Sequence, residues 1–77
     1  MSNAELIADL ELRAAKGPNG MLISKSMFEH FGEIVQAMNQ VGAVRHGSQV
    51  VSVGGRQYIV DRYTLPNGKT ILAGYGQ

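Results

Sequence analysis

The chain has 77 residues, no cysteine and a formal net charge of +1. A chain of this length buries only about 60% of the surface that its unfolded form exposes, so its stability is thin. The lack of cysteine excludes disulfides and thiolate metal sites, whereas association between copies stays open as a source of stability. We therefore expect one small domain over residues 1–77.

The amino-terminal segment has charged residues spread through it and no continuous apolar run, which does not fit a secretory signal. No stretch approaches the roughly 18 apolar residues that a membrane span needs. The composition also matches a protein kept in a reducing compartment, because it lacks cysteine. We expect a soluble, cytoplasmic protein that does not associate with membranes.

Charged residues are unevenly distributed along the chain. Residues 1–41 hold three Lys or Arg against five Asp or Glu, and residues 42–77 hold four against one. The first part is predicted to be helical and the second to form a sheet, so the helices are acidic and the sheet is basic. Charge separated in this way can steer an anionic partner toward one face, although a mild excess is also compatible with an ordinary solvated surface.

A first helix is predicted over about residues 3–16, because Ser2 or Asn3 can cap its free amide groups. Glu5 near its start and Lys16 near its end complement the helix dipole. The sequence Gly17-Pro18-Asn19-Gly20 ends it, and apolar residues recur at helical spacing along one stripe: Leu6, Ile7, Leu10 and Ala14.

A second helix is predicted over about residues 27–41, since Ser26 and Glu29 have the spacing of a capping box. Gly32 inside this helix indicates either a close approach of another backbone or a break. Residues 21–23 before it are apolar and could add a short strand or fill space. The expected apolar face of the helix consists of Met27, Phe28, Phe31, Ile34, Val35, Met38 and Val41.

Three runs rich in β-branched and aromatic residues predict strands over about residues 49–53, 56–64 and 69–75. Gly54-Gly55 suits a type I′ hairpin turn, and Pro66-Asn67-Gly68 suits a type I turn with a G1 bulge. We therefore expect an α+β fold, with two helices followed by a three-stranded antiparallel β-meander.

The predicted register sets Val53 opposite Arg56 and Tyr63 opposite Ile71, which sorts the sheet residues onto two faces. We expect the second helix to pack on the face that carries Ile59, Tyr63 and Ile71. The other face is our candidate partner-binding surface, unless one helix covers each face. Its apolar residues are Val51, Val53, Tyr58, Val60 and Leu72.

Signatures of catalysis are missing from the sequence. His30 and His46 have no metal-ligand spacing to another ligand, and no serine lies in a nucleophile-elbow context. We expect no enzymatic activity, no metal, no cofactor and no small-molecule substrate. The candidate anion or nucleic-acid contacts are Arg45, His46, Arg56, Arg62 and Lys69.

These patterns favour a small non-enzymatic binding module, a homo-oligomeric protein-interaction or accessory protein that uses an exposed sheet face or its third strand as an edge. The alternative is a DNA-binding protein of the winged helix-turn-helix type. It requires the second helix to break at Gly32 into helices over residues 24–31 and 33–41, with Gly54-Gly55 at the tip of the wing.

Overall fold

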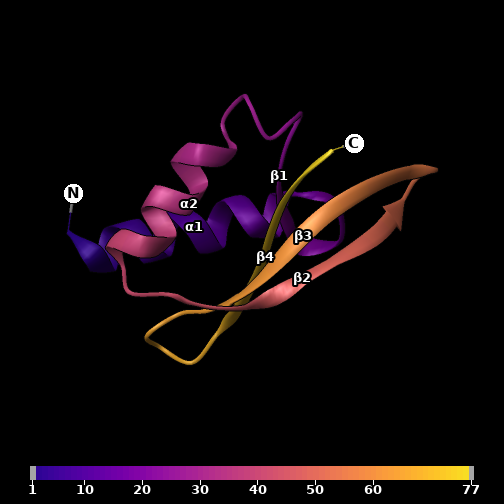
Figure 1. The fold of residues 1–77 in the computed structure, drawn as a ribbon. Coiled ribbons are helices and arrows are strands. Elements are labelled where there is room, and N and C mark those ends of the chain that lie inside the picture. The colour runs from indigo at the N-terminus through magenta and orange to yellow at the C-terminus, as the bar shows by residue number, and fades with distance from the viewer. Residues whose placement is uncertain (1, 77) are drawn as a thin grey trace.

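Two α-helices and a four-stranded sheet are built from residues 2–76, the part of the chain that the structure, a computed structural model, describes (Figure 1). The strand order is β1-β4-β3-β2, with β1 parallel to β4 and the other neighbours antiparallel. In chain order the elements are α1 (Asn3–Lys16), a 3-10 turn η1 (Pro18–Gly20), β1 (Met21–Ser24), α2 (Phe31–Gln40), β2 (Val44–Val53), β3 (Arg56–Thr64) and β4 (Thr70–Gly76).

The α+β class is as predicted, but a sheet of only three antiparallel strands is wrong, because β1 adds a fourth, parallel strand beside β4 of the meander. In this position Met21 is 1% exposed and Leu22 is also buried, so the pairing removes apolar surface that a free loop would leave in water. The third strand of the meander, β4, is therefore interior. The edges of the sheet are β1 and β2.

Turn chemistry sets the register of the meander. Gly54 and Gly55 have φ of 59° and 81°, which the mirror-image hairpin turn requires, and Val53 lies opposite Arg56 as predicted. Tyr63 also lies opposite Ile71, as predicted. β2 is longer than expected, since it begins at Val44 and passes through a bulge between Arg45 and Ser48.

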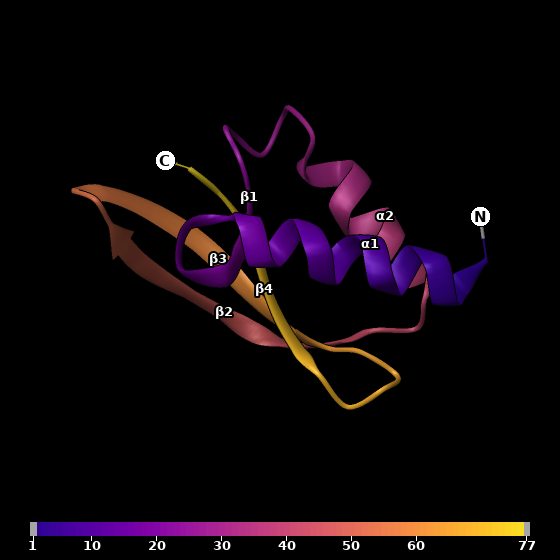
Figure 2. The ribbon, with the colours of Figure 1, turned by 180° about the vertical axis from the view of Figure 1, so that it is seen from behind.

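Both helices pack on one face of the sheet, as Figures 1 and 2 show. We call it the helix-covered face; the arrangement with one helix on each face does not occur. The buried core there draws on both helices and three strands, and consists of Leu10, Ala14, Leu22, Met38, Val41, Tyr63, Leu65, Ile71 and Ala73.

Helix α1 has the range that its capping predicts. The Ser2 hydroxyl accepts a hydrogen bond from the backbone N–H of Glu5 at 3.2 Å, which satisfies one of the donors that a helix start leaves free. Leu10 and Ala14 carry its buried stripe.

Helix α2 begins at Phe31, four residues later than predicted. Its pair Ser26 and Glu29 instead forms a turn in which the Glu29 N–H donates to the Ser26 carbonyl at 3.3 Å. The chain must rise here from β1 in the sheet to the helix layer, so residues 25–30 serve as a connection. The predicted core residue Phe28 is consequently 94% exposed.

The arrangement around Gly32 does not match the winged helix-turn-helix alternative. Gly32 lies within α2, without a break, and residues 25–30 before it form bends and turns. The part of the chain that the structure describes has two α-helices rather than three before the hairpin. A Cβ atom at Gly32 would meet nothing within 4 Å, so no close approach explains this glycine either.

The two phenylalanines of this region should respond oppositely to truncation. Phe31 is buried, with its ring centroid 4.9 Å from that of Tyr75 in an edge-to-face contact. Phe31→Ala should therefore lower the free energy of unfolding by about 3 to 5 kcal/mol, and Phe28→Ala should change it by less than about 0.5 kcal/mol. Denaturant unfolding of both variants measures this, and equal losses would contradict the exposure of Phe28 and the burial of Phe31.

Gly32→Ala should stabilise the protein. The site has helical backbone and open space around it, and alanine reduces the conformational entropy of the unfolded chain, a gain of roughly 0.4 to 1 kcal/mol. Thermal unfolding should show a higher midpoint than wild type. A lower midpoint would mean that the glycine meets a contact or a strained backbone that this arrangement lacks.

Candidate functional site: the open face of the sheet

The face of the sheet opposite the helices carries no helix (Figures 1 and 2); we call it the open face. Cross-strand partners place its residues together, because directly paired residues point to the same side. Val51 pairs with Tyr58, and Arg62 pairs with Leu72. Besides Gly74 and Gly76, the open face contains Met21, Ile23, Val44, Gln49, Val51, Val53, Arg56, Tyr58, Val60, Arg62, Thr64, Thr70 and Leu72.

Two glycines of β4 leave room on this face for side chains of β3. Val60 is opposite Gly74, where a Cβ atom would come within 2.7 Å of the Val60 Cγ1 atom. Tyr58 is opposite Gly76, where a Cβ atom would lie 3.5 Å from the ring. Val60 is therefore fully buried without any helix above it.

Apart from Val60 and Met21, which are buried, the apolar residues of the open face stay exposed or partly exposed. Val51, Val53, Tyr58 and Leu72 are each half-buried, in contrast to Val60 between them. The structure thus brings all five predicted partner-binding residues onto one face. Val51, Val53 and Tyr58 are neighbours across β2 and β3, and Leu72 lies beyond Val60, opposite Arg62. We call these four half-buried residues the apolar patch.

Arg56 and Arg62 flank this patch and are exposed. Neither makes an ion pair within residues 2–76. The acidic residues lie on the helices, on the connection before α2, or, for Asp61, on the helix-covered face. The open face is therefore cationic, with no carboxylate in the described part of the chain to neutralise it.

The other predicted anion contacts are held elsewhere. Arg45 forms an ion pair with Asp61 at 3.3 Å, and the Asp61 side chain is only 15% exposed. His46 Nε2 shares a hydrogen bond of 2.8 Å with the hydroxyl of Thr64. These contacts occupy the two groups, so the five predicted residues do not form one anion site.

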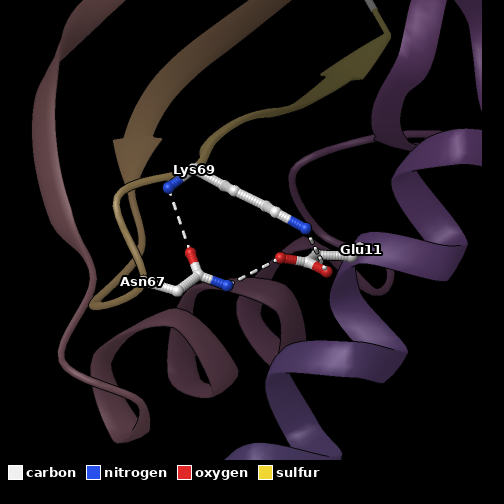
Figure 3. A network of polar contacts seen from close by, with 3 residues as sticks. All are labelled: Glu11, Asn67 and Lys69. Carbon is white, nitrogen blue, oxygen red and sulfur yellow. Dashed lines mark hydrogen bonds and ion pairs between the residues drawn. The ribbon is translucent and has the colours of Figure 1, made fainter.

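Lys69 belongs to a polar network that joins the β3–β4 turn to α1 (Figure 3). Its ammonium lies 3.6 Å from Glu11, and its backbone N–H donates to Asn67 at 3.0 Å. The Asn67 amide donates in turn to Glu11 at 2.9 Å. Lys69 therefore fastens a helix to the turn instead of facing the open face.

One cation near the open face was not predicted. Lys25 follows β1 and lines a hollow beside Arg56 and Tyr58, at the end of the sheet where β4 stops short of the hairpin tip. Its position depends on the parallel pairing of β1 with β4. No local pattern around Lys25 indicates that pairing.

Within residues 2–76 no group of three or more His, Asp or Glu side chains is arranged to hold a metal ion. No helix in that range is long and apolar enough to cross a membrane. The described residues show one clear pKa shift: burial, and secondarily the Asp61 carboxylate, raise the pKa of the Tyr63 hydroxyl.

Because of this shift, the free energy of unfolding should depend on pH in the alkaline range. Because the folded state favours the neutral hydroxyl, the contribution of Tyr63 is complete below the ordinary pKa of 10.0 and is lost as the pH rises past it. Wild type should lose unfolding free energy above that pH more steeply than Tyr63→Phe. Denaturant unfolding across the alkaline range measures the difference, and parallel curves would contradict it.

No protein-family model matches this chain, and no curated protein or solved structure matches it either. A functional assignment must therefore come from the geometry of the open face.

Proposed function

We propose that the protein is a non-enzymatic binding module whose open face docks an acidic surface of another protein. The observation that supports this is the apolar patch of Val51, Val53, Tyr58 and Leu72 with Arg56 and Arg62 beside it. A fold that places both helices on one side of the sheet leaves this patch in water.

The composition of the open face matches the anatomy of protein interfaces. Such interfaces have an apolar centre and a polar rim, and they are enriched in Tyr and Arg. Apolar surface rimmed by polar residues is a common mark of an interaction site. The rim of the open face is cationic, so its partner should present carboxylates there.

Nucleic acid is the competing partner. Phosphate neutralisation supplies most of the affinity for nucleic acid, and the open face offers only Arg56 and Arg62, with Lys25 nearby. One aromatic ring, Tyr58, is available there for stacking on bases. A helix-in-groove mode is less favourable, because α2 holds no Lys or Arg.

A second copy is a poor occupant for the open face. Two open faces in contact would bring four guanidinium groups into one interface without a carboxylate from either copy. Like charges in a desolvated interface are repulsive. The occupant is therefore expected to be a different chain.

Binding to purified partners tests the proposal. Proteins retained on immobilised wild type from nuclease-treated cell extract are identified, purified and titrated against the pure domain. Arg62→Ala and Arg56→Ala should each weaken the purified complex by several-fold, with less effect at high salt, because rim charges are screened.

Lys16→Ala is the matched control, since it removes the same unit of charge from α1, away from the open face. A complex insensitive to both arginine variants, or equally sensitive to Lys16→Ala, would contradict the proposal. Tight binding of duplex or single-stranded DNA that is lost in Arg56→Ala/Arg62→Ala would replace the acidic protein with nucleic acid.

A further inference from the structure

The two edges of the sheet differ in how they are protected. β1 is short, with four residues, and α1 packs beside it. β2 has ten residues and is exposed along most of its length. Its distal part belongs to a hairpin that projects beyond both helices (Figure 1). An edge strand of this length is a template for pairing with another chain.

β2 lacks the usual devices that block such pairing over its distal half. Residues 48–53 read Ser-Gln-Val-Val-Ser-Val, with no charge and no proline. Val50 in this segment is 57% exposed on the helix-covered face, and Val51 and Val53 are half-buried on the open face. The bulge between Arg45 and Ser48 interrupts the regular edge before this segment begins.

The hydrogen-bonding direction of this segment follows from its turn. In a hairpin closed by two residues, the pair that flanks the turn exchanges both backbone hydrogen bonds, and bonded pairs then alternate. Val53 and Arg56 flank the turn, so Val53, Val51 and Gln49 bond to β3. Ser48, Val50 and Ser52 direct their backbone N–H and C=O groups outward.

We infer that residues 48–53 of β2 pair antiparallel with the same segment of a second copy, to give a dimer with one continuous eight-stranded sheet. A two-fold axis at Val50 or Val51 matches outward donors to outward acceptors in both copies and keeps each face continuous with its counterpart. Residues 48–53 carry no charge, so pairing the two copies of this segment brings no like charges together. In the antiparallel arrangement Arg45 of each copy lies beyond opposite ends of the overlap.

This inference is independent of the proposed function, because the edge of β2 and the open face are different surfaces. It makes a further statement about the open face, however. In the dimer the two open faces lie side by side on one sheet, which repeats the patch and its arginines across the two-fold axis.

Ser52 is the position for a sharp test. Ser52→Pro removes an outward N–H and leaves the bonds between β2 and β3 in place, and edge strands tolerate proline with its nitrogen toward solvent. Sedimentation of wild type over a wide concentration range should show a monomer–dimer equilibrium. Ser52→Pro should raise the dimer dissociation constant by at least about tenfold.

Ser52→Lys is a second variant that introduces no backbone restriction and should act in the same direction. The matched control for Ser52→Lys is Gln57→Lys, which places the same charge on β3, directly across from Ser52. It should leave the dimer dissociation constant within about twofold of the wild-type value. Far-ultraviolet circular dichroism confirms that each monomer is folded.

A single cysteine gives an independent readout, because the chain has none and any disulfide must join two copies. Val50→Cys should cross-link on mild oxidation if the axis lies at Val50, and Val51→Cys should do so if it lies at Val51. Thr70→Cys, exposed on β4, should not cross-link. A wild type that stays monomeric at every concentration would overturn the inference. A dimer of undiminished affinity in both Ser52 variants would overturn it as well.

Discussion

The pairing of β1 with β4 is the constraint on which the rest of the structure depends. It joins residues 21–24 to residues 72–75, so it closes the chain from its first third to its last strand. It buries Met21 and Leu22 on opposite sides of the sheet. Because β1 follows α1 after a short turn, the pairing also holds α1 beside this edge and directs it onto the helix-covered face.

The same pairing explains where α2 begins and where it lies. A chain that leaves the sheet at Ser24 must change layer before it can start a helix, and residues 25–30 are used for that change. With both helices on one side, the core closes around Met38, which is fully buried. On the open face no helix covers the sheet, and Val60 is buried there because β4 has a glycine opposite it.

The sequence was informative where a few neighbouring residues decide the geometry. Gly54-Gly55 and Asn67-Gly68 select their turns by backbone preference, and two turns are enough to set the register of three strands. The capping-box spacing of Ser26 and Glu29 is also local, but residues 25–30 form the connection from β1 to the helix layer, and α2 begins only at Phe31. Parallel pairing between residues 21–24 and 72–75 has no local signature at all. The unpredicted position of Lys25, the exposure of Phe28 and the interior position of β4 all follow from that one missing contact.

The placement of charged residues, like the strand order, depends on contacts between distant parts of the chain that the sequence does not reveal. Arg45 and Lys69 are candidate anion contacts from their positions in the sequence, yet each lies within salt-bridge distance of a carboxylate that only the fold brings near. Asp61 and Arg62 are neighbours in the chain and cancel in any count of net charge. A strand sends successive side chains to opposite faces, so Asp61 enters the helix-covered face beside Arg45 while Arg62 stands on the open face. The alternation of a single strand thus separates two adjacent charges and leaves the open face basic, although the whole chain is nearly neutral.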